Sequence, residues 1–259
     1  MSADRPLLSV RDVTRTWDGV HGCHHVSFDL YPGEVLCVVG ESGSGKSTLL
    51  QAVSMQAPPQ SGSLHYDVRE QGMTDLATLS SARLRLLART DWGFVRQHAR
   101  DGLRMQVSAG ANIAERLMAV GERHYGDLRA AAGAWLEKME IDLGRLDDAP
   151  ASFSGGMQQR LQIARNLVTH PRLVFMDEPT ASLDVSVQAR LLDLLRRLVG
   201  DLGLAAIIVT HDLAVARLLA HRTLVMQGGR VVESGLTDQV LDDPQHPYTQ
   251  LLVSSILQV

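Results

Sequence analysis

Cysteine is scarce in this chain, and this scarcity excludes the disulfide-rich class of small secreted domains. Only Cys23 and Cys37 occur among the 259 residues. Cys37 lies in an apolar, strand-like run, where a free thiol behaves as a small buried side chain. Structural disulfides belong to oxidising compartments. Two cysteines of this kind therefore suit a reducing cytoplasm, where we expect the protein to reside.

Long hydrophobic runs and a surplus of basic charge are also missing. No stretch approaches the roughly 20 apolar residues that a membrane-spanning helix needs, and residues 1–6 contain no apolar signal core. The formal net charge is −4, which gives no reason to expect nucleic acid as the main partner. We therefore expect neither direct membrane insertion nor a nucleic-acid partner.

The chain has instead the size and composition of one large globular domain. It is 45% hydrophobic and 21% charged, as ordinary soluble proteins are. This length accommodates one α/β core with an inserted subdomain, and it is too short for two such cores in tandem.

A phosphate-binding loop is predicted between an apolar run at 35–39 and a helical segment at 46–55. The motif matches G-x-x-x-x-G-K-[ST], in which backbone N–H groups surround phosphate oxygens at the positive end of the following helix. Lys46 is expected to reach the β and γ phosphates, and the Ser47 hydroxyl to bind Mg²⁺. The loop consists of Gly40, Glu41, Ser42, Gly43, Ser44, Gly45, Lys46, Ser47 and Thr48.

The alternative for this loop is a glycine-rich turn without a ligand. A bare turn has no need of the Gly-Lys-Ser triplet at its end, so ATP and Mg²⁺ are the expected cofactors. Trp17 lies upstream of the loop. Its ring suits stacking on adenine, but a core or rim aromatic explains the residue equally well, and spacing alone does not decide.

Polar side chains follow two further apolar runs, where strands are expected to end. Asp177 and Glu178 come directly after the run at 173–176, and His211 follows the run at 205–209 by one residue. Ligands of parallel α/β sheets bind at the carboxyl ends of strands. We therefore expect Asp177 to bind Mg²⁺, Glu178 to act as base and His211 to contact the γ phosphate. The alternatives are a helix cap for the acids and a structural role for the histidine.

Helical periodicity dominates the middle of the chain. Helices are predicted over 107–120 and 127–140, forming an inserted helical subdomain. Ser154 then opens another helix with two glycines in its first turn, which indicates either a helix cap or a second anion-binding helix end.

Four other segments have simpler patterns. Residues 67–75 are expected to be a polar loop, and residues 80–89 a basic amphipathic helix. Its Arg83, Arg85 and Arg89 ordinarily mark a solvated face, with partner docking as the alternative. A hairpin is predicted around 227–229, and a helix over 248–257.

With these residues in order, the chain resembles the ATP-binding-cassette ATPases over nearly its whole length. The phosphate loop is followed by Gln97, Ser154 to Gln158, Leu173 to Glu178, Ser182 to Asp184, and His211. These look like the family's Q-loop, signature motif, Walker B motif, D-loop and switch histidine. The resemblance implies an α/β fold: a P-loop ATPase core with an antiparallel β subdomain and an inserted α-helical subdomain. Within this single nucleotide-binding domain, residues 1–96 and 166–259 would form the core, and 97–165 the helical subdomain.

The resemblance also implies a second protomer, because the family forms head-to-tail dimers that close over ATP. A homodimer is expected, with pairing to a homologous cassette as the alternative. Gln97 would link the metal to the helical subdomain. The further residues implied to contact the nucleotide are Ser154, Gly155, Gly156, Gln158 and Asp184.

Within the family, the chain most resembles the ATPases of carbon-phosphorus lyase systems, which degrade phosphonates. The segments that carry this resemblance are 97–98, 101–104, 106–110, 115–118, 124–127, 153–170 and 246–255, with Ala99 and Ala111 standing where proline and glycine are expected. It implies a carbon-phosphorus lyase core complex as partner. Peptide-importer ATPases share the tail at 246–248, so a membrane permease is the alternative. A binding module with little turnover is a third possibility.

Overall fold

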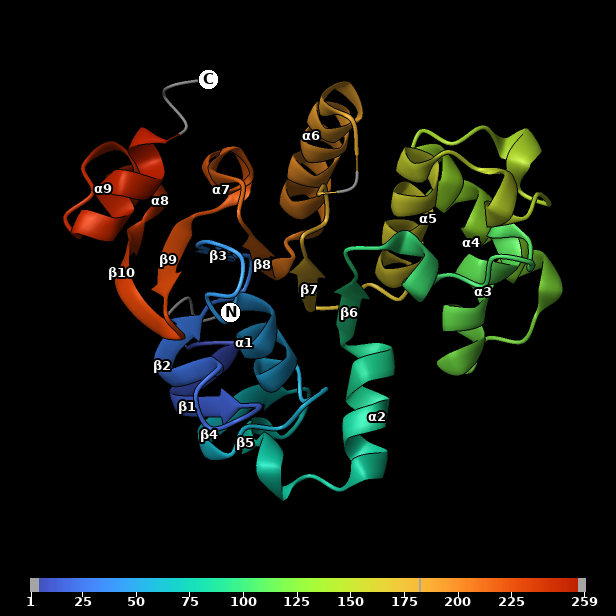
Figure 1. Ribbon diagram of the computed structural model, residues 1–259. Coiled ribbons are helices and arrows are strands. Elements are labelled where there is room, and N and C mark those ends of the chain that lie inside the picture. Colours follow the sequence, from blue (N-terminus) through green and yellow to red (C-terminus); the bar gives the residue numbers. More distant parts are fainter. Residues whose placement is uncertain (1–4, 182, 256–259) are drawn as a thin grey trace. The chain divides into compact units, whose positions relative to one another are not determined.

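The computed structural model describes residues 5–181 and 183–255. The chain divides into two compact units, one formed by Met1–Leu84 with Gly203–Val259 and the other by Arg85–Leu202 (Figure 1). The subdomain boundaries implied by the resemblance, near 97 and 165, lie inside the second unit and stay a prediction.

The first unit contains an antiparallel sheet in the order β2-β1-β4-β5. Leu8 pairs with both Leu30 and Tyr66, and all three side chains are buried. Directly paired residues point to the same face of a sheet, so these three form part of one core. The strands are β1 (Leu8–Thr16), β2 (Gly22–Leu30), β4 (Ser61–Val68) and β5 (Gly72–Asp75).

The polar loop expected over 67–75 is wrong, because this segment completes a hairpin. β4 continues to Val68, which pairs with Gly72 at the start of β5. All four β5 residues are half-buried, so the strand lacks the apolar–polar alternation by which strands are recognised in a sequence. Glu70, at φ 66°, lies in the turn that reverses the chain.

Four strands of the first unit follow the order β10-β9-β3-β8. β3 is parallel to both of its neighbours. Every residue of β3 and β8 is buried, which explains their uninterrupted apolar sequences. β9 and β10 form the predicted hairpin. The strands are β3 (Val35–Val39), β8 (Ala205–Thr210), β9 (Arg222–Gln227) and β10 (Arg230–Leu236).

Short helices complete the first unit. The closing helix expected over 248–257 is present from Pro247 to Ser254, and the last residues of that expectation lie outside the described part of the chain. The helices and the 3-10 turn of this unit are α1 (Lys46–Val53), η1 (Leu76–Thr78), α7 (Leu213–Leu219), α8 (Thr237–Asp242) and α9 (Pro247–Ser254).

The second unit combines a parallel strand pair with helices. β6 (Trp92–Val95) is parallel to β7 (Leu173–Asp177), and the Phe175 ring contacts those of Trp92 and Phe94 at centroid distances of 5.5 and 5.2 Å. The elements between and after these strands are η2 (Ala99–Gly102), α3 (Ala109–Ala119), α4 (Tyr125–Lys138), η3 (Leu143–Arg145), η4 (Pro150–Ser152), α5 (Gly155–Leu167) and α6 (Val185–Leu202).

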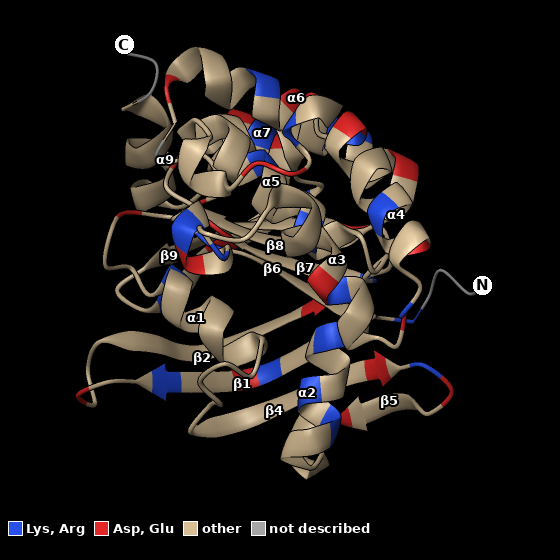
Figure 2. Ribbon diagram, turned by 90° about the vertical axis from the view of Figure 1, so that its right-hand side faces the viewer, with Lys and Arg blue, Asp and Glu red and all other residues tan. Residues whose placement is uncertain are grey.

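Both predicted helices of the insert are confirmed, since α3 and α4 begin and end within two residues of their expected bounds. The basic helix α2 (Ser81–Thr90) is also confirmed. Its arginines are exposed and colour much of the helix blue (Figure 2). No helix in the described ranges is long and apolar enough to cross a membrane.

Candidate functional site

The predicted phosphate loop joins the end of β3 to the start of α1. Lys46 is the first residue of α1 and is only 6% exposed. Its Nζ donates hydrogen bonds to the carbonyl oxygens of Gly40 at 2.7 Å and Glu41 at 2.8 Å. The lysine therefore folds back across the loop and places its charge beside the backbone amides that would bind a phosphate.

Glycine is required at both ends of this loop. Gly40 has φ 148°, and a Cβ there would lie 2.2 Å from the carbonyl oxygen of Met226. Gly45 has φ 99°, and its Cβ would lie 2.1 Å from the carbonyl oxygen of Gly22. Any side chain would force the loop away from these strands, so close backbone packing as well as turn geometry determines the motif.

A buried hydroxyl supports the fit of a phosphate group. Ser44 is 6% exposed, and its Oγ has no hydrogen-bond partner among the described residues. The backbone carbonyl of Ser44, in contrast, has a partner, because it accepts a hydrogen bond from Gly229 N–H at 3.0 Å. Buried polar atoms ordinarily have a partner. A phosphate oxygen would supply one, and the Ser47 hydroxyl is the hard oxygen ligand that Mg²⁺ prefers.

Trp17 lies beside the helix that carries the loop. Its Nε1 donates to Thr48 Oγ1 at 3.2 Å, and the Arg15 guanidinium is 5.0 Å from the ring centroid. The residue is 61% exposed, so it is not a core aromatic. The structure thus excludes a core role for Trp17, and adenine stacking on the exposed ring stays a prediction.

Tyr248 is a contact of the loop that sequence reasoning missed. The Glu41 N–H donates to its phenol oxygen at 3.0 Å, across a separation of 207 residues. The start of α9 is itself fastened to β10, because the Glu233 carboxylate accepts hydrogen bonds from the amides of Gln245 and His246. The carboxyl-terminal helix therefore braces the first turn of the phosphate loop.

We expect Tyr248→Phe to weaken nucleotide binding without unfolding the protein. The ring packing is kept, but the loop loses one hydrogen bond worth about 0.5–1.5 kcal/mol and becomes costlier to order on binding. The Kd for Mg-ATP should rise about two- to tenfold, as measured by calorimetric titration. Tyr125→Phe, at a 72% exposed ring in the second unit, is the matched control. Equal affinities for the two variants would show that the hydrogen bond from Glu41 to Tyr248 contributes nothing to nucleotide binding.

His211 is brought to the same end of the sheet as the phosphate loop. Val39 and Thr210 are directly paired in the parallel strands β3 and β8, so Gly40 and His211 each follow one member of the pair. His211 is exposed, and the next residue, Asp212, caps α7 by accepting from Ala214 N–H at 2.8 Å. The structure thus places His211 at the predicted strand end, and its contact with the γ phosphate stays a prediction.

The predicted acids and Gln97 share one end of the strand pair in the second unit. Val95 pairs with Met176, so Asp177, Glu178 and Gln97 all lie just beyond paired residues. Glu178 has φ 45°, a left-handed conformation that costs a non-glycine residue about 1–3 kcal/mol and is concentrated at functional sites. Neither the motif nor the periodicity signals this conformation.

The segment at 154–158 begins α5. The Ser154 hydroxyl accepts from Met157 N–H at 3.3 Å as the helix N-cap. Gly156 is buried, and a Cβ there would lie 2.5 Å from Val187 Cγ1. Gln158 is also buried and donates to the carbonyls of Pro150 and Phe153. The side chain of Gln158 therefore holds the turn that presents Ser154 and Gly155 at the exposed helix end.

The predicted site residues fall into two groups. The first unit carries Trp17, the phosphate loop and His211, and the second carries Gln97, Asp177, Glu178, the 154–158 segment and Asp184. Asp184 is exposed, and its carbonyl begins α6 by accepting from the amides of Val187 and Gln188. Ser182 lies outside the described residues. The catalytic and ligand-binding roles of both groups stay predictions.

Comparison with known proteins identifies the family to which these features belong. A family model described as ABC transporter matches residues 23–181. The chain is 66% identical over 255 residues to the phosphonates utilization ATP-binding protein PhnK of Escherichia coli (strain K12), covering 98% of this chain and 99% of PhnK. It is 37% identical to the glutathione import ATP-binding protein GsiA of the same strain, over 97% of this chain but only 41% of GsiA.

Solved structures of ATP-binding cassettes share the fold. The dimeric, post-hydrolysis structure of the cassette MJ0796 bound to ADP and Pi superposes with a TM-score of 0.79 at 27% identity, covering 89% of this chain and 98% of MJ0796. CbiO1 of Clostridium perfringens, part of the transporter complex CbiONQ, also has a TM-score of 0.79 at 27% identity, covering 93% of this chain and 92% of CbiO1. The α/β fold with an antiparallel β subdomain is therefore confirmed.

Proposed function

We propose that this chain, which belongs to the ABC transporter family of ATPases, uses Mg-ATP to drive conformational change in a phosphonate-degrading carbon-phosphorus lyase core complex in the cytoplasm. The chain is an ATP-hydrolysing cassette and a homologue of an ATP-binding protein of phosphonate utilization. The observation that carries the finer proposal is the 66% identity to PhnK along nearly the full length of both chains.

In this proposal the first unit binds the nucleotide. The amides of the loop from Gly40 to Thr48 and the Lys46 ammonium hold the phosphates, and the exposed Trp17 ring stacks on adenine. Ser47, Asp177 and Gln97 would hold Mg²⁺. When bound, the metal neutralises charge that develops on the phosphate oxygens.

The chemical step belongs to residues at the strand ends. Glu178 orients the attacking water and removes its proton, while His211 donates a hydrogen bond to the γ phosphate and stabilises the charge that moves during transfer. The strained backbone of Glu178 supports this assignment, because such strain positions side chains at functional sites.

Dimer closure completes the site. Ser154, Gly155 and Gly156 at the exposed start of α5 in one protomer would cover the γ phosphate bound by the other, since a helix N-terminus attracts anions. Gln158 supports that turn from within, and Asp184 would approach the nucleotide across the interface. In a head-to-tail pair, each protomer supplies the start of its α5 to the nucleotide that the other protomer binds. ATP binding therefore closes the pair, and hydrolysis reopens it.

A second candidate function is that of an importer ATPase. It is favoured by the 37% identity to GsiA, a glutathione import protein, and by the His246-Pro247-Tyr248 tail that the sequence analysis assigns to peptide importers as well. The nucleotide chemistry would be the same in that case, but the partner would be a membrane permease.

The experiment that separates the two functions is purification of the tagged protein from its native cell. We expect the soluble fraction to yield a carbon-phosphorus lyase core, and the Glu178→Gln variant with Mg-ATP to retain more of it, because blocked hydrolysis would prolong the closed state. Measurement is by mass spectrometry of soluble and membrane fractions. Recovery of a permease in place of the core would overturn the proposal.

A further inference from the structure

An arginine-lined pocket lies on the second unit, and none of its lining residues is assigned to ATP. It is open to solvent, measures about 440 Å³ and is lined by Arg89, Glu115, Arg116, Met118, Ala119, Arg123 and Arg165. The four arginines come from the end of α2, from α3, from the α3–α4 connection and from α5. Arginines from four separate segments thus line one cavity.

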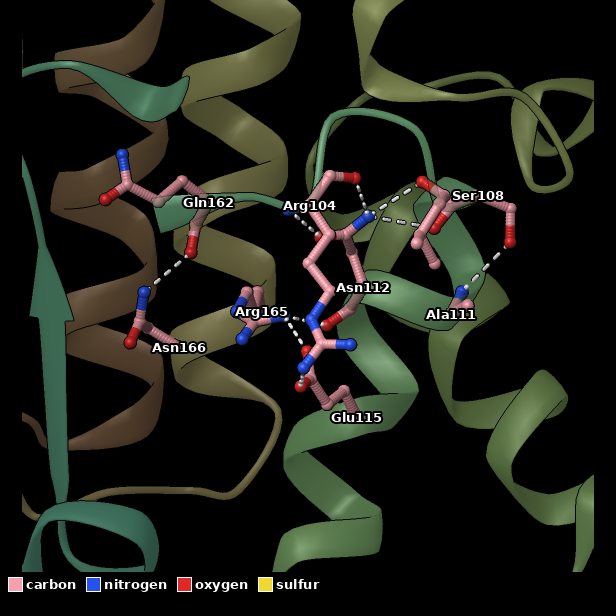
Figure 3. A network of polar contacts seen from close by, with 9 residues as sticks. Arg104, Ser108, Ala111, Asn112, Glu115, Gln162, Arg165 and Asn166 are labelled. Atoms are coloured by element: carbon pink, nitrogen blue, oxygen red, sulfur yellow. Dashed lines mark hydrogen bonds and ion pairs between the residues drawn. The ribbon is translucent and has the colours of Figure 1, made fainter. Parts of the chain in front are cut away.

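The carboxylate of Glu115, which lines the pocket beside these arginines, is already engaged twice. Arg165 lies 2.7 Å from one oxygen of Glu115, and Arg104 lies 2.5 Å from the other. Both ion pairs are visible in Figure 3, where Arg165 also donates to the carbonyl of Asn112 at 2.9 Å. One negative charge therefore faces several positive ones, and the pocket retains positive charge.

The positive charge of Arg116 in this pocket is only partly compensated by hydrogen-bond acceptors. Its terminal nitrogens donate to the carbonyls of Ala88 and Trp92, and its Nε is buried without a hydrogen-bond partner among the described residues. Burial, together with the positive charges of Arg165 and Arg89, lowers the pKa of Arg116 to about 10. The side chain stays charged at neutral pH, so the burial of its charge remains unfavourable in free energy. A nearby anion would offset this desolvation cost.

Glu122, the acid next to Arg123 in the sequence, uses its carboxylate to bind backbone amides and not the Arg123 guanidinium. Glu122 accepts hydrogen bonds from the amides of Arg123 and His124 at 2.7 and 2.8 Å. The Arg123 guanidinium donates to the carbonyls of Met118 and Glu122. It has backbone partners but no ion pair in the described part of the chain.

We propose that this pocket binds a dianionic oxyanion of the phosphate or phosphonate class. Arginine favours such groups, because its planar fork of N–H donors matches two oxygens at once and charge-assisted hydrogen bonds are the strong ones. A concave pocket lined by four arginines suits a compact anion with several oxygens. This anion site goes beyond the proposed function, and its evidence is the pocket alone. The proposal would therefore remain valid even if the chain had no carbon-phosphorus lyase partner.

The test is calorimetric titration of the full chain with inorganic phosphate, methylphosphonate and acetate. A non-hydrolysable ATP analogue with Mg²⁺ fills the phosphate loop throughout, so that added phosphate cannot bind there. Arg89→Gln and Arg123→Gln remove charge at exposed positions of the pocket. Arg85→Gln makes the same change at an exposed position of α2 that does not line the pocket, and it is the matched control.

We expect the wild type to bind phosphate and methylphosphonate at millimolar concentrations or below, and each pocket variant to bind about tenfold more weakly. The control should bind as the wild type does, and added salt should weaken binding. Unaltered melting temperatures of the variants exclude misfolding. No binding at millimolar anion, or binding equal in all variants, overturns the proposal. Acetate binding as tightly as methylphosphonate also overturns it and assigns the pocket to carboxylates, such as acidic side chains of a protein partner.

Discussion

Replacing Glu178 with glutamine is expected to lower ATP turnover about 10²- to 10⁴-fold, the usual contribution of a general base. Glutamine keeps the size of the side chain but cannot accept the proton of the attacking water. The base is needed only in the chemical step, so the affinity for Mg-ATP should change little. Phosphate release under saturating ATP measures turnover, and calorimetric titration measures affinity. A variant that hydrolyses ATP at the wild-type rate would contradict the assignment.

Glu70→Gln is a matched control for this variant. Glu70 also has a left-handed backbone, with φ 66° against 45° at Glu178. It lies in the exposed turn between β4 and β5. The charge change and the backbone requirement are therefore the same at both positions. If both variants lost turnover equally, the effect at Glu178 would come from the backbone or from net charge rather than from catalysis.

Replacing Lys46 with alanine is expected to abolish most of the stabilisation that Mg-ATP confers. A ligand at about 100 times its Kd stabilises the folded state by about 2.7 kcal/mol, which corresponds to roughly 5–10 °C for a chain of this size. The variant loses a buried ammonium that faces the phosphates. Its ligand-free melting temperature should also fall, because the carbonyls of Gly40 and Glu41 lose their donor.

The measurement is the difference in melting temperature with and without Mg-ATP for each protein, so that the ligand-free change is subtracted. Lys138→Ala is the control, since Lys138 is the only other lysine in the chain and is exposed on α4. Its ammonium lies 4.8 Å from the Trp135 ring centroid, a contact worth only about 0.5–1 kcal/mol at an exposed site. An undiminished ligand-induced shift in the Lys46 variant would exclude its role in binding phosphate.

Elements with local signals could be predicted well. The phosphate loop is a run of nine neighbouring residues that follows a fully buried strand and continues into the first turn of α1, so its turn geometry depends mainly on its own glycines. The helices α3 and α4 carry the apolar spacing of one buried face. In contrast, β5 is a short edge strand without alternation, and it exists because β4 offers it backbone hydrogen bonds.

The sequence by itself determined the α/β class, the phosphate-loop motif and the order of the motifs, because each of these depends on residues adjacent in the chain or on periodicity. It determined the family through the resemblance of those motifs, in that order, to known ATPases. Tertiary structure alone decided what depends on distant residues: the bond from Glu41 to Tyr248, the exposure of Trp17 and the gathering of arginines from four segments into one pocket. Local sequence patterns do not indicate which residues become neighbours in space when these lie up to about two hundred positions apart in the chain. Packing brings such residues together only after the strands and helices have formed.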